Sequence, residues 1–227
     1  YLAPVFETVA RVKSQLDPGK ALIGFAGAPW TVATYMLAGK GTKDPSAQRS
    51  FWYDQPDAFD LLIDKLVTVT TDYLIAQIEA GADAVQLFDS WAAGLPEDLF
   101  KRACFAPTAM IARRVKEKYP AVPIIAFPKG AGPHYQSYAK EESFDALSID
   151  TGLPWHWVRE HLSPTKVIQG GLDPLLVVKG GDVMAKAALD LRDCFADMPY
   201  IFNLGHGFVP ETPPEYVAQL VKIIRGI

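Results

Sequence analysis

The sequence predicts an α/β protein, a (β/α)8 barrel of the TIM type to which these 227 residues supply about six βα units. Six short apolar runs alternate with longer helical patterns along the chain. The runs are continuously apolar, which is typical of parallel strands that helices cover on both faces. An open dinucleotide-binding sheet is disfavoured, because the first run ends GFAGAPW, with Pro29 where a glycine would approach a pyrophosphate.

The strand–helix pairs follow one another without an obvious linker. Strands are expected at 21–27, 84–90, 122–130, 146–150, 166–173 and 200–207. Helices are expected after them at 28–37, 95–119, 135–142, 153–162, 183–195 and 213–224, with a long helix at 58–80. The last helix shows a capping-box pattern, with Thr212 as N-cap, Pro213 in the first helical position and Glu215 three residues after Thr212.

The chain opens on an amphipathic helical pattern without an initiator Met. We therefore expect residues 1–227 to form a single domain, the C-terminal two-thirds of a barrel, with two further βα units upstream. A barrel that lacked two strands would leave open sheet edges, which are a poor stable state.

Charge and composition argue against several classes of partner, namely nucleic acid, membrane and metal. The net charge of −4 argues against nucleic acid, for which a basic face would be needed. The most apolar stretch, 58–80, carries five charged residues, so no membrane span is expected. Cys104 and Cys194 lie far apart without metal-ligand spacing, which indicates reduced cysteines in a cytoplasmic protein and no metal site.

Polar residues follow each expected strand, and the carboxyl ends of the strands carry the chemistry in a βα barrel. In chain order these rim residues are Gly27, Trp30 and Tyr35; Asp89, Ser90 and Trp91; Lys129; Asp150; Asp173; and Asn203 with His206. Structural interpretations stay open for them. A helical tyrosine is often half-buried packing, Asp89 and Ser90 could form an N-cap pair, and the other aspartates could cap helices.

His206 is the strongest candidate. It stands between Gly205 and Gly207, and glycines let a ligand or the backbone approach the imidazole closely. The other three histidines have no metal-ligand spacing with a cysteine, carboxylate or second histidine.

The segments IGFAGAPWTVATYML, LFDSWAAG, VIQGGLDP and IFNLGHGFVPETPPE, in this order, resemble the uroporphyrinogen decarboxylase family from about Leu22 to the end of the chain. The resemblance implies a distorted (β/α)8 barrel and a cytoplasmic homodimer that needs no cofactor. It implies an enzyme that converts the four acetate side chains of uroporphyrinogen III into methyl groups, giving coproporphyrinogen III for haem and chlorophyll biosynthesis. By motif, the tetrapyrrole substrate would bind to Tyr35, Ser90 and His206.

The sequence departs from the family pattern in two ways. Gly171 stands where an Asn is usual, which we interpret as a tolerated change in a turn. The family's RQAGRY-type loop, with its two arginines, and an aspartate that faces the pyrrole nitrogens are not found in these residues. No catalytic residue is therefore assigned in this chain, and the chain by itself is expected to be inactive.

The positive charge needed for a substrate with eight carboxylates is also sparse near the expected rim. The arginines at 102, 113, 114, 159, 192 and 225 fall on expected helices, and only Lys40, Lys43, Arg49 and Lys129 are expected near the rim. Two alternatives stay open: a zinc- and cobalamin-linked methyltransferase of the same fold, disfavoured because no His-x-Cys motif occurs, and a non-catalytic tetrapyrrole-binding module.

Overall fold

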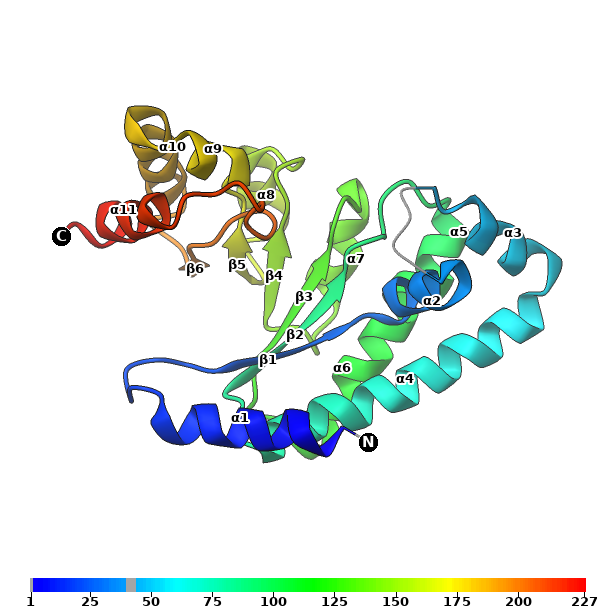
Figure 1. Ribbon diagram of the computed structural model, residues 1–227. Coiled ribbons are helices and arrows are strands. Elements are labelled where there is room, and N and C mark those ends of the chain that lie inside the picture. The colour runs from blue at the N-terminus through cyan, green and yellow to red at the C-terminus, as the bar shows by residue number, and fades with distance from the viewer. Residues whose placement is uncertain (1, 40–43) are drawn as a thin grey trace. The chain divides into compact units, whose positions relative to one another are not determined.

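The computed structural model describes residues 2–39 and 44–227, which form two compact units (Figure 1). The first unit extends to Ala131 and includes Glu141–Asp145, and the second holds Gly132–Lys140 and Ala146–Ile227. Each unit contains three parallel strands that follow chain order, so the predicted alternation of strands and helices is confirmed. The single-domain organisation stays a prediction.

The first unit begins with a helix and then builds β1, β2 and β3 with helices between them. Its elements are α1 (Ala3–Gln15), β1 (Ile23–Gly27), α2 (Pro29–Ala38), α3 (Ser46–Asp54), α4 (Pro56–Glu79), β2 (Ala84–Asp89), α5 (Glu97–Leu99), the π-helix η1 (Phe100–Phe105), α6 (Ala106–Lys118) and β3 (Ile124–Pro128). The register places Gly27 beside Phe88 and Asp89 beside Pro128, so the three strands end at one edge. Val85, Leu87 and Ile124 are fully buried at the centre of this unit.

The prediction that every strand is buried on both faces is wrong for β1. Ile23 and Phe25 project from the same side of this strand, and Phe25 is 61% exposed. Successive side chains of a strand point to opposite faces, so only the side that carries Gly24 and Ala26 is covered, in part by Gln77 of α4. Gln77 also binds the backbone N–H and C=O of Phe25.

The segments α5, η1 and α6 form one continuous helix with a wide turn in its middle. Pro107 explains the wide turn, because it has no N–H and its ring would clash with the carbonyl four residues earlier, that of Ala103. A π-turn relieves such a clash within a helix. The same turn buries Cys104 completely.

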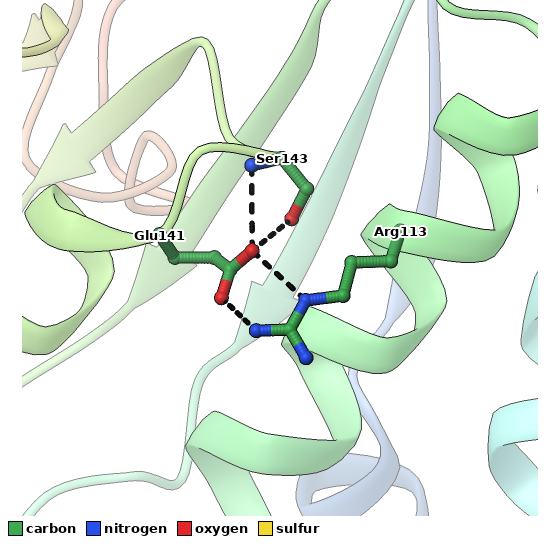
Figure 2. Close-up of polar contacts among 3 residues, drawn as sticks. All are labelled: Arg113, Glu141 and Ser143. Atoms are coloured by element: carbon green, nitrogen blue, oxygen red, sulfur yellow. Dashed lines mark hydrogen bonds and ion pairs between the residues drawn. The ribbon is translucent and has the colours of Figure 1, made fainter.

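Glu141–Asp145 is held to the first unit by polar side chains. Arg113 of α6 donates from Nε to Glu141 Oε1 at 3.0 Å and also makes an ion pair with Oε2 (Figure 2). Ser143 Oγ donates to Glu141 Oε1 at 2.9 Å. Burial tends to raise the pKa of Glu141, but the hydrogen bonds from Arg113 and Ser143 outweigh it and hold the pKa below its usual value. Asp145 Oδ2 accepts the Ile124 N–H at 2.7 Å, at the start of β3.

The second unit has shorter strands. Its elements are η2 (Gly132–His134), α7 (Tyr135–Lys140), β4 (Ala146–Ile149), α8 (Trp155–His161), β5 (Val167–Gly170), α9 (Pro174–Lys179), α10 (Gly181–Cys194), β6 (Tyr200–Ile201) and α11 (Pro214–Arg225). Strand β5 lies between β4 and β6, and both pairings are parallel. Leu147, Ile168 and Val177 are fully buried in its core.

Two predictions for the end of the chain need correction. The last strand stops at Ile201 instead of reaching residue 207, and only a bridge between Leu172 and Leu204 continues the pairing. The capping box is not formed: Pro213 is the N-cap of α11, and Pro214 is the first helical residue. Pro213 adopts extended backbone, as expected for a residue followed by proline, so the helix cannot begin before Pro214.

None of the helices in 2–39 and 44–227 is both long and apolar enough to cross a membrane.

Candidate functional site

The carboxyl end of β2 is organised by the buried carboxyl group of Asp89, which is 2% exposed. Its Oδ1 accepts a hydrogen bond from Thr31 Oγ1 at 2.7 Å, and Thr31 lies in the first turn of α2. The backbone N–H of Thr31 also interacts with this carboxyl group. Asp89 therefore connects the end of one strand to the start of the helix that follows another.

The contact between Asp89 and Thr31 acts as a helix cap. The N-cap residue of α2 is Ala28, whose methyl side chain has no oxygen to accept the unpaired N–H groups of the first turn. Asp89, distant in sequence, supplies that acceptor. The interpretation of Asp89 and Ser90 as an N-cap pair for the helix after them is wrong, because a turn follows them and α5 begins at Glu97.

Two further hydrogen bonds fix the turn that follows Asp89. The N–H of Trp91 donates to Thr31 Oγ1 at 3.4 Å, and Trp30 Nε1 donates to the carbonyl oxygen of Trp91 at 2.9 Å. Trp30 is fully buried, so this contact is protected from water. The turn is thus held by two neighbouring residues of α2.

Tyr35 and Ser90 lie on these two joined elements. Tyr35 is 46% exposed on α2, and its ring makes an edge contact with Trp91 at 6.1 Å between centroids. Ser90 is half-buried in the turn, directly before Trp91. The structure therefore brings together two of the three predicted substrate-binding residues, with the Tyr35 ring accessible to a ligand.

Burial raises the pKa of Asp89 to about 6, although Thr31 and the Cys104 thiol oppose the shift. The same burial, together with the charge of Asp89, raises the pKa of Cys104 well above its usual value, so the thiol stays protonated. Cys104 is therefore neither a nucleophile nor a ready metal ligand. Thr31 and Cys104 were missed by sequence reasoning, because nothing in their local pattern marks them as partners of Asp89.

Lys129 follows β3 at the same edge and is half-buried. Its N–H donates to the carbonyl oxygen of Asp89 at 3.1 Å. Gly130 then takes a positive φ of 74°, and a Cβ at that position would lie 2.6 Å from the Cβ of Ala93. The segment after β3 thus packs tightly on the segment after β2.

In the second unit, Asp150 organises the turn after β4. Its Oδ1 accepts the N–H of Gly152 at 2.8 Å, and Tyr135 donates its hydroxyl to the carbonyl of Ser148 at 3.0 Å and to Asp150 Oδ2 at 3.4 Å. Asp173 has the capping role that was left open for it, since its carboxylate accepts the Leu175 N–H at the start of α9. A hollow of about 520 Å³ lies between these two turns.

His206 is exposed in the loop after β6, and its two glycines differ in what surrounds them. A Cβ on Gly205 would lie 2.8 Å from the backbone nitrogen of Thr151, whereas a Cβ on Gly207 would meet nothing within 4 Å. Gly205 is therefore needed so that the loop can pack on the turn after Asp150, and Gly207 alone fits the expectation of open space beside the imidazole. Asn203, the other predicted residue of this loop, accepts the N–H of Leu204 with its own side chain.

Gly171 has a φ of 103°, and a Cβ there would lie 3.1 Å from Ile149. Glycine is well suited to this backbone, which supports a structural account of the departure from the family pattern.

The predicted arginines lie on helices: η1, α6, α8, α10 and α11. Arg102, Arg113 and Arg159 are engaged in ion pairs with Asp60, Glu141 and Asp197. Lys40 and Lys43 lie outside the described residues. In the part of the chain that the structure describes, no three histidine, cysteine or acidic residues lie close enough together to hold a metal ion.

Parallel strands that alternate with helices, and polar residues at their carboxyl ends, are typical of the class of βα-barrel enzymes. Within this class, the chain belongs to the uroporphyrinogen decarboxylase (URO-D) family, whose model matches residues 1–227. The prediction of the fold class and the resemblance noted in the sequence are thereby confirmed.

The relatives agree on one name. The chain is 50% identical over 225 residues to uroporphyrinogen decarboxylase of Rhodospirillum rubrum, and 47% identical over 226 residues to that of Sinorhizobium fredii. These alignments cover 99% and 100% of the chain. The chain spans about 65% of the length of these curated relatives.

Among solved structures, a methyltransferase from Methanosarcina mazei superposes with a TM-score of 0.83 at 19% identity, covering 98% of this chain and 63% of its own. A putative vitamin-B12 independent methionine synthase from Listeria monocytogenes gives a TM-score of 0.64 at 16% identity, covering 98% and 68%. At such low identity the likeness concerns the fold.

Proposed function

We propose that the protein is a carboxy-lyase that converts the four acetate side chains of uroporphyrinogen III into methyl groups and yields coproporphyrinogen III in porphyrin biosynthesis. The observation that carries the proposal is the match of all 227 residues to the URO-D family. The curated relatives, at 44–50% identity, bear the name of this activity.

The reaction defines what the site must supply. A carboxylate on the carbon next to a pyrrole leaves only when the ring can accept the electron pair. Protonation of the pyrrole ring carbon makes that possible; CO₂ then departs, the exocyclic methylene accepts a proton, and the ring carbon returns its proton. Each acetate thus consumes one proton and releases one CO₂. The site must donate protons, stabilise a cationic pyrrole and hold the substrate's carboxylates.

Tyr35, Ser90 and His206 are proposed as the substrate-binding residues of this chain. Two hydroxyl groups and an imidazole can each donate a hydrogen bond to a carboxylate. Tyr35 and Ser90 lie on elements joined through Asp89 and Thr31, which supports a common role for them. For His206, binding a carboxylate ranks above donating a proton.

The proton chemistry is assigned to the family segment with two arginines and an aspartate, which these 227 residues do not contain. Arginines suit carboxylates because they bind them with two parallel hydrogen bonds. In the described parts of the chain, Arg102, Arg113 and Arg159 already pair with acidic residues. The chain studied by itself is therefore proposed to be inactive.

The test is to assay the full-length gene product and the 227-residue chain for coproporphyrinogen formation, with CO₂ release measured in parallel. The full-length protein should release four CO₂ for each coproporphyrinogen. Failure of the full-length protein to turn over would overturn the proposed function. Substantial turnover by the 227-residue chain would overturn only the assignment of proton chemistry to the other segment.

His206→Asn in the full-length protein separates the two roles of this residue. Loss of carboxylate binding should raise KM and leave the pH profile of kcat unchanged. Loss of one limb of the profile would assign proton transfer to His206 instead.

We further propose a cytoplasmic homodimer that works without a cofactor. Sedimentation of the purified full-length protein should give twice the protomer mass, and a monomer at working concentrations would exclude the dimer. Elemental analysis tests the competing methyltransferase activity, because stoichiometric zinc would favour that activity over decarboxylation.

A further inference from the structure

Tyr35 and Ser90 are the residues of the first unit that are proposed to bind substrate, and other side chains set their positions. Tyr35 depends on the orientation of α2, and Ser90 depends on the turn after β2. The link between the two elements passes through the side chain of Thr31, which donates to Asp89 at 2.7 Å and accepts from the Trp91 N–H at 3.4 Å.

We propose that Asp89 is a positioning residue which, through Thr31, holds the helix of Tyr35 and the turn of Ser90 at the separation that binds a carboxylated substrate. This inference rests on the proposed function, because the separation matters only if both hydroxyl groups bind one ligand. Neither Asp89 nor Thr31 is assigned a contact with the substrate.

Packing alone does not account for a carboxyl group at this position. Asp89 is 2% exposed, and burying a carboxyl group is costly unless hydrogen bonds compensate. Its Oδ2 makes no hydrogen bond to the nitrogen and oxygen groups of residues 2–39 and 44–227, and the thiol of Cys104 interacts with the carboxyl group. An apolar side chain would avoid this cost but could not bind Thr31. The strong contact that compensates for burying the Asp89 carboxyl group is therefore its hydrogen bond to Thr31 of α2.

The contacts around the link make it stiff. Trp30 Nε1 binds the Trp91 carbonyl from the same turn of α2, and the Ala28 N–H donates to the Phe88 carbonyl at 2.8 Å. The Tyr35 ring rests on Trp91 itself. A shift of α2 relative to the β2 turn would therefore change the separation of Tyr35 and Ser90, so that the two hydroxyl groups would bind one ligand less tightly.

The test uses threonine variants in the full-length protein. Thr31→Val keeps the shape of the side chain and removes both hydrogen bonds of its hydroxyl group, whereas Thr31→Ser keeps the hydroxyl group. Thr71→Val is the matched control, because Thr71 is also buried and its hydroxyl group donates to the Val67 carbonyl in its own helix. We expect Thr31→Val to raise KM by roughly tenfold or more with a smaller change in kcat, and Thr31→Ser to restore KM to within about threefold.

A second measurement does not depend on activity. The Trp30 indole N–H gives its own ¹H–¹⁵N resonance, which reports on the bond to Trp91. Thr31→Val and Asp89→Leu should shift this resonance, and Asp89→Asn, which keeps an acceptor oxygen, should shift it less. Thr71→Val should leave it in place. If Asp89→Leu fails to fold, the comparison of Thr31→Val with Thr31→Ser still tests the positioning role.

The outcomes separate the two proposals. If the wild-type protein produces no coproporphyrinogen, the proposed function fails, and the indole resonance alone tests whether the link exists. If the wild-type protein is active but Thr31→Val has the KM of Thr71→Val, the positioning role is overturned. An equal loss in Thr31→Val and Thr31→Ser would also overturn it, because the hydroxyl group would then not be what matters.

Discussion

The two units position their candidate site residues in different ways, which we call side-chain fastening and backbone fastening. In the first unit, side-chain hydrogen bonds of Asp89, Thr31 and Trp30 join the β2 turn to α2. In the second unit, backbone packing positions the candidate residue: the loop of His206 lies on the turn after Asp150 through Gly205, where no side chain fits.

The difference shows that the same sequence feature can have two structural roles. Asp89 and Asp150 both end an apolar strand and both are buried. Asp89 binds the start of a helix 58 residues away in sequence, whereas Asp150 accepts the Gly152 N–H within its own turn and the hydroxyl group of Tyr135. Side-chain fastening should respond to pH and to loss of a hydrogen bond, and backbone fastening should respond to added volume.

The largest expected effect tests the backbone fastening. Gly205→Ala places a Cβ 2.8 Å from the Thr151 nitrogen and 2.9 Å from its Cγ2, so the loop must move. We expect the free energy of unfolding to fall by about 3 kcal/mol, at the upper end for overpacking. Chemical denaturation measures it. The control is Gly207→Ala, which meets nothing within 4 Å and should change stability by less than about 0.5 kcal/mol. Equal effects of the two substitutions would contradict the comparison.

The next effect tests the side-chain fastening through pH. The pKa of Asp89 is about 6 in the folded protein, against about 3.9 in an unfolded chain. At Asp89 the folded state therefore binds more protons than the unfolded state between about pH 4 and 6, and the contribution of this group to stability falls as pH rises through this window. Asp89→Asn removes the ionisation and keeps an acceptor for Thr31. The variant should match wild type near pH 4 and exceed it by about 2 kcal/mol above pH 7.

Urea denaturation at several pH values gives the difference in unfolding free energy between Asp89→Asn and wild type. A difference that does not change between pH 4 and 7 would show that the carboxyl group does not titrate in this range.

A smaller effect is expected for the ion pair between Arg113 and Glu141, which tests whether side chains also position a segment of the first unit beyond the β2 turn. Arg113→Met leaves the nearly buried carboxylate of Glu141 with Ser143 as its remaining partner in Figure 2. Because Arg113 is itself largely exposed, we expect a loss of about 1 kcal/mol in unfolding free energy at pH 7. The pKa of Glu141 is lowered, so its stabilisation is present above about pH 4.3 and is lost as pH falls through the lower, folded-state pKa.

The matched control for this ion pair is Lys186→Met in the second unit. Lys186 and Asp190 form an exposed pair one helical turn apart, which is worth roughly 0.3–0.5 kcal/mol. Thermal denaturation at pH 7 and pH 3 compares the two variants. If Lys186→Met costs as much as Arg113→Met, the Glu141 contact is no more than an ordinary surface pair.

The sequence predicted the order and type of the elements well, because each strand is an apolar run bounded by turn residues. The ends of elements were harder to predict. The last strand stops after Ile201, and its pairing resumes at Leu204 through the bonds from the Leu172 N–H to the Asn203 carbonyl and from the Gly205 N–H to the Leu172 carbonyl, contacts that depend on the folded loop. The pattern at Thr212 predicted a capping box, but Pro213 has an extended backbone because Pro214 follows it. The helix therefore begins at Pro214.

The positions of the candidate residues could be predicted in part, while their roles stay predictions. The rim residues follow from strand ends, and Tyr35 contacts Trp91, the residue after Ser90. The link between Asp89 and Thr31 could not be predicted, because 58 residues separate them and each is an ordinary residue in its local pattern. The role of Gly205 also required the neighbouring turn to be seen.

The wide turn before Pro107 has a consequence at the level of the gene. This turn holds more residues than a regular helical turn, so removing a single codon within Phe100–Phe105 would close it to an α-helical turn and bring the Pro107 ring against a carbonyl of the preceding turn, at a cost of about 3 kcal/mol. An in-frame deletion scan should therefore find this segment intolerant of shortening, whereas single substitutions on its exposed side, such as Lys101→Gln, should be tolerated.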